Sequence, residues 1–239
     1  MRIDMEPQDR IRLVRNIFSR VAFRYDLLNH LLSLGRDVFW RNAAARRARV
    51  FQSGRILDLA AGTGDMAMTL SRTWPDSLVY GVDFTYPMLE LAKPKLEKEG
   101  LNRVFLAGGD ALCLPFPDNS FDTVTMAFGI RNIPDKVQAF QEILRVLNPG
   151  GRLLILELTF PRWSFVRRLY DSYLNRLIPV MGGLVSGQSG AYQYLADSIM
   201  DFPTPEAFRD LMTECGFVKS GFIKFTFGVC ILHHGEKIQ

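Results

Sequence analysis

The chain has 239 residues, 48% of them hydrophobic and 23% charged, which is enough to bury the core of one domain without metal or disulfide support. Cys113, Cys215 and Cys230 are far apart and have no metal-ligand spacing, so we expect a reduced, cytoplasmic protein with no metal site. No apolar run approaches the roughly 20 residues of a membrane-spanning helix and no secretory leader is visible, so we expect neither an integral membrane protein nor a secreted one.

The charge is distributed unevenly along the chain. Residues 1–55 carry twelve Lys and Arg against five Asp and Glu, although the net charge of the whole chain is only +4. Apolar residues recur at helical spacing over 9–32, with arginines over much of the remaining surface, and a second helix is predicted over 37–50. A basic helical segment indicates an acidic partner surface, either anionic lipid headgroups or nucleic acid.

From residue 55 onward, short apolar runs alternate with helical patterns. This alternation predicts βαβ units in a parallel sheet, and the nearly continuous apolar strands predict helices on both faces. The predicted strands cover 55–59, 78–82, 104–107, 121–127 and 152–158, the helices 65–73, 88–98 and 137–147, and a turn covers 148–151.

The pattern changes after residue 159. We interpret 159–203 as a helical and loop insertion, followed by a helix over 205–215 and a closing pair of strands over 217–226 and 227–233. The expected fold is a single Rossmann-like α/β domain over 1–239 with a mostly parallel seven-stranded sheet. In it, the helical segment 9–50 and the insertion 159–203 would form a cap over the substrate.

The most informative stretch is 56–65, ILDLAAGTGD, where a buried strand runs into a Gly-x-Gly turn and then a helix. Gly62 and Gly64 let the backbone approach a ligand closely. Asp83 ends the next strand, nineteen residues after Gly64, where a carboxylate can accept hydrogen bonds from both hydroxyls of a ribose. Dinucleotide-binding enzymes share this pattern, because Gly62, Gly64 and Ala67 also satisfy their GxGxxG/A fingerprint.

Three features favour S-adenosylmethionine over a dinucleotide. Asp58 lies inside the first strand beside the turn, where a carboxylate suits the cationic amino-acid portion of this cofactor and would repel a pyrophosphate. Asp110 follows the third strand, where adenine would lie, and the run PFPDNSFD at 115–122 is typical of class I methyltransferases. The residues therefore predict a class I S-adenosylmethionine-dependent methyltransferase, whose cofactor contacts would include Asp58, Ala60, Gly62, Gly64, Asp83, Phe84, Met88, Gly109 and Asp110.

Nearly the whole chain, from about Val14 to Lys237, resembles the ubiquinone/menaquinone biosynthesis C-methyltransferase family. The segments that carry the resemblance are FRYDLLN at 23–29, LSLG at 32–35, WR at 40–41, AFGIRNIPD at 127–135, YQYLADSI at 192–199, FP at 202–203 and the GV, LH and GEK within 228–237. The resemblance implies methylation of a ring carbon of a prenylated quinol, and cofactor contacts at Thr63, Asp83, Asp110 and Ala111. A further contact falls on Ala127, where some relatives carry serine, so only a backbone contact is expected there.

A quinol carbon becomes nucleophilic when a ring hydroxyl loses its proton, so the protein should offer a proton acceptor and positive charge near the developing oxyanion. Arg131 is predicted to stabilise this oxygen and Asn132 to hold a water, with the alternative that both pin their loop by hydrogen bonds. Residues predicted to line the ring pocket, with core packing as the alternative for the tyrosines, are Tyr25, Asn29, Phe128, Tyr192 and Tyr194.

A prenylated acceptor resides in the bilayer, so the protein should meet the membrane surface. The basic helix over 9–32 and a basic-aromatic cluster at 162–168 are the candidates for peripheral contact with the cytoplasmic face, unless the helix is simply solvated. The alternative is a methyltransferase for another small lipophilic acceptor or for RNA, but the sequence lacks an evident single-strand binding platform, so we expect no nucleic acid partner. A binding module without activity is a third class. Demethylmenaquinol is favoured over a benzoquinol acceptor, and a homodimer is allowed for.

Overall fold

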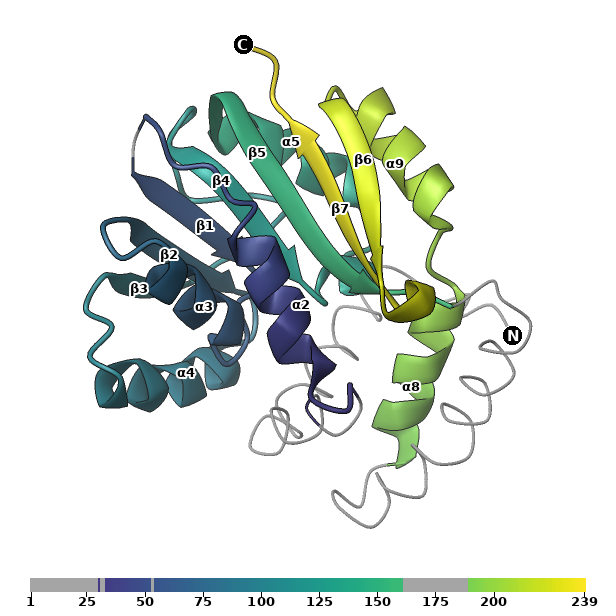
Figure 1. Ribbon diagram of the computed structural model, residues 1–239, viewed down its shortest axis with the longest axis horizontal. Coiled ribbons are helices and arrows are strands. Elements are labelled where there is room, and N and C mark those ends of the chain that lie inside the picture. The colour runs from purple at the N-terminus through teal and green to yellow at the C-terminus, as the bar shows by residue number, and fades with distance from the viewer. Residues whose placement is uncertain (1–29, 31–32, 53, 161–188) are drawn as a thin grey trace.

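The computed structural model describes residues 30, 33–52, 54–160 and 189–239. Within them, the chain forms one seven-stranded sheet with the order β3-β2-β1-β4-β5-β7-β6, in which the neighbouring pairs among the first five strands run parallel. Strand β7 runs antiparallel to both of its neighbours, β5 and β6. The mostly parallel sheet with a closing antiparallel strand is the topology that the sequence predicts (Figure 1).

The strands are β1 Arg55–Leu59, β2 Leu78–Asp83, β3 Val104–Gly108, β4 Phe121–Ala127, β5 Leu147–Leu158, β6 Val218–Phe225 and β7 Cys230–Glu236. The helices are α2 Arg36–Ala45, α3 Asp65–Thr73, α4 Tyr86–Lys98, α5 Lys136–Val146, α8 Ser189–Met200 and α9 Pro205–Glu214, with short 3₁₀ turns η1 Ile130–Asn132 and η3 Thr226–Gly228. The predicted bounds of β1, β4 and α3 agree with these residue for residue.

Helix α2 is shorter than the predicted helix over 37–50, because side chains of β4 bind the backbone that follows it. The carboxylate of Asp122 accepts hydrogen bonds from the backbone N–H groups of Phe51, Gln52 and Gly54, at 2.9 to 3.2 Å. Asp122 is fully buried, and the hydroxyl of neighbouring Thr123 accepts from the N–H of Arg49 at 2.9 Å. These contacts stabilise an extended entry into β1, which a continued helix would have to break.

Two other regions differ from the prediction by more than two residues. The predicted turn at 148–151 lies within β5, where the register shifts between the pairs Phe121–Leu147 and Thr123–Arg152, so the extra residues form an irregularity of the strand. The predicted closing strands over 217–226 and 227–233 are separated by η3, and the last strand extends to Glu236.

Two clusters of buried side chains hold the helices against the sheet. One contains residues of α5 and α9 with Leu57 and Leu59 of β1, and the other contains residues of α2 and α3 with Ile56. Because successive side chains of a strand point to opposite faces, the two clusters lie on opposite sides of β1. Figure 1 shows α2 in front of the sheet and α8 beyond the ends of β5 and β7.

Several predictions lie partly or wholly outside the described residues. These include the helix over 9–32 apart from His30, the sites Tyr25 and Asn29, the cluster at 162–168, and most of the insertion 159–203. The side chain of Tyr192 also lies outside, although its backbone belongs to α8. Among the residues that are described, no helix is both long and apolar enough to cross a bilayer.

Candidate functional site

The turn between β1 and α3 has a backbone conformation that most side chains avoid. Ala60 has a φ of 53°, Gly62 of 56° and Gly64 of 84°. A Cβ on Gly64 would also lie 3.1 Å from the Cβ of Ala92, because α4 packs closely against the turn. The Gly-x-Gly spacing therefore serves both a left-handed backbone and a close helix contact, and it exposes the main chain of the turn to a ligand.

Asp83, at the end of β2, fixes this turn from the neighbouring strand. Its Oδ2 accepts a hydrogen bond from the N–H of Gly62 at 2.7 Å and its Oδ1 from the N–H of Thr85 at 2.7 Å. Burial raises the pKa of Asp83, and the bonds from Thr85 and Gly62 oppose that rise. An ionised carboxylate has lone pairs beyond these two bonds, so it can still accept hydrogen bonds from a ribose.

Asp58 is a second carboxylate near the turn and is fully buried within β1. Burial raises its pKa to about 7, while the hydroxyl of Thr125, which donates to Oδ1 at 2.7 Å, and the positive charge of Arg41 both lower it. Among the described residues, Oδ2 has no partner that meets hydrogen-bond criteria. The backbone N–H of Ala67, in α3, also acts to lower this pKa.

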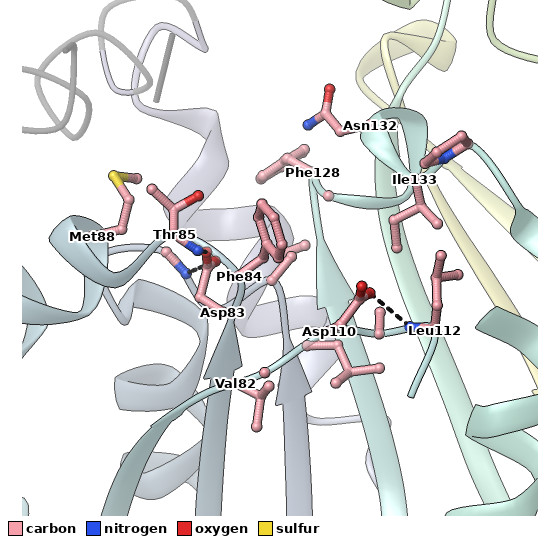
Figure 2. Close-up of a pocket in the computed structure, with 18 residues that line it drawn as sticks. Val82, Asp83, Phe84, Thr85, Met88, Asp110, Leu112, Phe128, Asn132 and Ile133 are labelled. Carbon is pink, nitrogen blue, oxygen red and sulfur yellow. Dashed lines mark hydrogen bonds between the residues drawn. The ribbon is translucent and has the colours of Figure 1, made fainter. Parts of the chain in front are cut away.

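A pocket opens at the carboxyl ends of the parallel strands, the usual ligand site of such sheets. Its wall is largely apolar, with Asp83, Asp110 and Asn132 as its principal polar side chains. Figure 2 shows Asp83 and Met88 on one side of this space and Asn132 and Ile133 on the other. Asp110 is exposed and its Oδ1 accepts a hydrogen bond from the N–H of Leu112 at 2.9 Å.

Most of the predicted cofactor contacts meet in this pocket: Ala60, Gly62, Asp83, Phe84, Met88, Gly109, Asp110, Ala111 and Ala127 all line it. Asp58, Thr63 and Gly64 lie beside the lining, in β1 and the turn. Of the residues predicted for the acceptor, Phe128 and Asn132 line the pocket. Arg131 and Tyr194 do not, and both are almost fully buried.

The contacts of Arg131 are those expected if its side chain anchors the loop after β4. Its Nη1 donates to Oε1 of Glu157 and to the carbonyl oxygen of Phe128, each at 2.6 Å. The N–H of Arg131 donates to Oε2 of the same carboxylate at 3.2 Å. The guanidinium thus ties the loop after β4 to β5, and the predicted stabilisation of a substrate oxygen by Arg131 stays a prediction.

Asn132 and Tyr194 form a polar pair at the side of the pocket formed by η1. The hydroxyl of Tyr194, from α8, donates to Oδ1 of Asn132 at 3.0 Å. This bond joins the insertion to the loop after β4, and it orients the Asn132 amide so that its NH₂ group is available to other partners.

Sequence reasoning missed part of the lining, namely Leu59, Val82, Thr85, Leu112, Gly129, Ile133 and Pro134. Ile133 and Pro134 lie within the resembling segment 127–135, and Thr85 is two residues after Asp83, so position in the motif could have indicated them. Gly129 is required by packing: a Cβ there would lie 2.5 Å from the Cβ of Ala60. Over the residues that the structure describes, no three His, Cys, Asp or Glu side chains gather into a metal site.

The pocket fits S-adenosylmethionine better than a dinucleotide. Asp83 lies where ribose hydroxyls would be bound, and the apolar residues around Asp110 can enclose a base. Asp58 lies beside the turn, and its ionised form would favour an ammonium group there and repel a pyrophosphate.

Comparisons with solved structures support this fold. A methyltransferase from Thermotoga maritima, described as a possible histamine N-methyltransferase, matches with a TM-score of 0.65 at 22% identity, over 93% of this chain and 98% of that one. A methyltransferase from Aquifex aeolicus matches with a TM-score of 0.64 at 17% identity, over 89% of this chain and 98% of that one. The sheet is therefore that of a class I S-adenosylmethionine-dependent methyltransferase.

Curated sequence relatives are much more similar. The demethylmenaquinone methyltransferase of Thermus thermophilus is 48% identical over 92% of this chain and 100% of its own length. The ubiquinone/menaquinone biosynthesis C-methyltransferase of Geobacter sulfurreducens is 45% identical over 94% of this chain and 88% of its own length. The model of the ubiE/COQ5 methyltransferase family matches residues 5–237, which include every strand of the sheet and the whole pocket. The chain therefore belongs to the ubiE/COQ5 methyltransferase family.

Proposed function

We propose that this protein transfers a methyl group from S-adenosylmethionine to a ring carbon of a prenylated quinol, with demethylmenaquinol as the favoured acceptor. The observation that carries the proposal is the 48% identity to a demethylmenaquinone methyltransferase across that protein's full length. The pocket supports it, because a carboxylate for ribose, an apolar wall and a polar acceptor side lie together at the strand ends.

The cofactor side of the site is assigned to the turn and the ends of β1 to β3. Asp83 would bind the ribose hydroxyls, and the segment Gly109–Leu112 with Asp110 would enclose the adenine. Asp58 would face the ammonium group of the amino-acid end, with the backbone of Ala60, Gly62, Thr63 and Gly64 around it. Phe84, Met88, Ala111 and Ala127 would complete the contacts.

When bound, the cofactor supplies a methyl group already activated on a positively charged sulfur. The protein then has to orient the quinol ring and favour loss of a hydroxyl proton, because the resulting oxyanion makes the adjacent carbon nucleophilic. Asn132, oriented by Tyr194, lines the pocket and can hold a hydroxyl or a water there. Arg131 would contribute by fixing the Phe128 loop, or directly through its charge if the loop opens toward it.

The protein would be a single domain over 1–239, with helices on both faces of its sheet. The segments 9–50 and 159–203 would form a cap over the substrate. Contacts to the quinol ring would come from Tyr25, Asn29 and Tyr192. A cytoplasmic protein would meet the membrane peripherally. Exposed apolar side chains on and before α2 and on η3 support this contact, with exposed fractions of 83% at Leu34, 55% at Phe39 and 74% at Phe227. A homodimer would be compatible with this contact with the membrane.

The test is methyl transfer from radiolabelled S-adenosylmethionine to three acceptors in parallel: reduced demethylmenaquinone, a reduced benzoquinol precursor and bulk RNA. Label in the naphthoquinol product is expected. Label in the benzoquinol alone would move the protein to ubiquinone synthesis, and label only in RNA would overturn the quinol assignment. Asp83→Ala should abolish transfer to any acceptor. Asp76→Asn, which neutralises an exposed carboxylate before β2, is the matched control and should leave transfer intact.

A further inference from the structure

Arg41 is a buried cation that joins three elements around the pocket. It lies on α2 with only 6% of its surface exposed, and its Nη1 forms an ion pair with Asp37 one turn earlier. Its Nη2 lies 3.8 Å from Oδ2 of Asp65, the first residue of α3 after the Gly-x-Gly turn. Its guanidinium also lies over the ring of Phe128, 5.3 Å from the ring centre.

The surroundings of Arg41 are built to hold a charge in place. Asp37 is 2% exposed, and its carboxylate also accepts a hydrogen bond from the hydroxyl of Ser33 at 2.7 Å and pairs with His30 at 2.8 Å. Asp65 in turn binds Nζ of Lys95 at 2.5 Å. Attaching α2 to the sheet does not need this arrangement, because Trp40 and Ala44 already bury apolar surface there, and burying ions costs free energy.

Two neighbours of Arg41 outside its own helix lie in or next to the pocket wall. Phe128 lines the pocket and has a φ of 61°, a conformation that a bulky side chain keeps only when its surroundings impose it. The ring of Phe128 is bounded by Arg41 and by Trp40, whose ring centre is 6.3 Å away. Asp65 begins the helix whose N-terminus completes the cofactor turn.

We propose that Arg41 is a positioning residue for the amino-acid end of the cofactor: it clamps Phe128 and the start of α3, the two segments that flank the turn after β1. The inference rests on the proposed function for the identity of the cofactor. Its chemical basis is that the amino-acid end is zwitterionic, so a site for it needs a negative group and a positive group in fixed relation.

The electrostatics of Asp58 agree with this role. Apart from burial, the groups that act on the pKa of its carboxyl are the hydroxyl of Thr125 from β4, Arg41 from α2, Asp83 from β2 and the N–H of Ala67 from α3. Burial raises the pKa of Asp58 to about 7, Asp83 adds to that rise, and Arg41 is the cation that opposes it. Removing the charge of Arg41 should therefore leave a larger fraction of Asp58 protonated at neutral pH, where a neutral carboxyl binds an ammonium group poorly.

The experiment is a calorimetric titration of the full chain with S-adenosylmethionine between pH 6 and pH 9. For the wild type, the affinity for S-adenosylmethionine should rise as the pH increases through about 7. At the lower pH values, binding should release a proton. Arg41→Met should weaken binding at pH 7 by roughly tenfold and move the rise in affinity upward by about one pH unit. Arg36→Met, which removes an exposed cation from the same helix, should change neither quantity.

The affinity for decarboxylated S-adenosylmethionine gives a second readout. A residue that only anchored α2 would not change the preference between the two forms of the cofactor. If Arg41 serves the carboxylate end, the wild type should prefer the complete cofactor and Arg41→Met should lose most of that preference. If Arg41→Met does not fold, Arg41→Lys keeps the charge but loses the flat contact with Phe128. It should then keep the pH profile while lowering kcat.

The outcomes separate this inference from the function on which it rests. A wild type that does not bind S-adenosylmethionine overturns the proposed function. A wild type that binds, together with an Arg41→Met variant that is folded and has the same affinity, pH profile and preference, overturns the role of Arg41 alone. If only Arg41→Lys folds, an altered pH profile in that variant overturns it.

Discussion

The ion pair between Arg131 and Glu157 should be the most sensitive buried contact of the site. Arg131 is 5% exposed and Glu157 0%, so removing the guanidinium leaves an uncompensated carboxylate inside the protein. Breaking such a pair costs about 3–5 kcal/mol of unfolding free energy. In a chain of this length, that corresponds to a fall in Tm of roughly 10 °C. Arg131→Met should show this loss in urea and thermal unfolding.

A second substitution tests the reason for the loss. Glu157→Gln removes the charge but keeps an oxygen that can accept from the N–H of Leu158, as Glu157 Oε1 does at 2.8 Å. Arg131→Met with Glu157→Gln should therefore recover about 2 kcal/mol relative to Arg131→Met alone. A loss below about 1 kcal/mol for Arg131→Met, which is the range of exposed ion pairs, would refute the reasoning.

The same double variant separates the two roles of Arg131. If Arg131 only anchors the loop, kcat of the folded double variant should stay within a few-fold of the wild type at saturating quinol. Direct stabilisation of an oxyanion by Arg131 predicts a loss of about 10²–10³ in kcat. The contacts to Glu157 and to the carbonyl of Phe128 favour the smaller effect.

Three further perturbations test other parts of the structure. Burial holds the pKa of His233 at about 3, below its ordinary 6.5, so the unfolded chain takes up this proton first as pH falls. The free energy of unfolding should drop through that window, by about 2 kcal/mol at pH 5, and His233→Leu should remove this drop in urea titrations at pH 8 and pH 5. Asp58, with its raised pKa, acts in the opposite direction, so the comparison is made between variant and wild type at each pH. Gly129→Ala would place a Cβ 2.5 Å from that of Ala60, which should cost about 1–3 kcal/mol and weaken cofactor binding measured by calorimetry. Gly108→Ala, which has open space, should do neither, and equal behaviour of the two variants would contradict the packing argument. Tyr194→Phe removes the bond to Asn132 and should lower kcat while leaving the KM for S-adenosylmethionine unchanged, whereas a rise in that KM alone would assign Tyr194 to the cofactor side.

The parts of the fold that the sequence predicts well are those governed by local patterns. Strand β1, the Gly-x-Gly turn and α3 follow from an apolar run, two glycines and a helical period within twenty residues. The position of Asp83 follows from the length of one βα unit. These features bring most of the cofactor lining together without knowledge of distant contacts.

The features that sequence reasoning missed depend on partners far along the chain. The end of α2 is set by Asp122, about 70 residues later, and the orientation of Arg131 by Glu157, 26 residues later. Arg41 belongs to a resembling segment, but nothing in its local pattern says that its guanidinium reaches Phe128, because that contact exists only once β4 lies beside β1. Tertiary contacts of this kind override local propensity without leaving a periodic signal.

Two non-glycine residues in the pocket wall have a left-handed backbone. Their strain suggests why so many ionic groups surround the pocket. Ala60 and Phe128 follow β1 and β4, which are neighbours in the sheet, and Gly129 lets the two turns approach each other. Each such conformation costs of order 1–3 kcal/mol and persists only where the surroundings impose it. For Phe128 the restraints are identifiable: Arg131 binds its carbonyl oxygen, and Arg41 and Trp40 enclose its ring. The buried pairs Arg131–Glu157 and Arg41–Asp37 contribute little net stability when compared with apolar packing. Their effect is geometric, because together they hold one strained residue, Phe128, between the turn after β1 and η1.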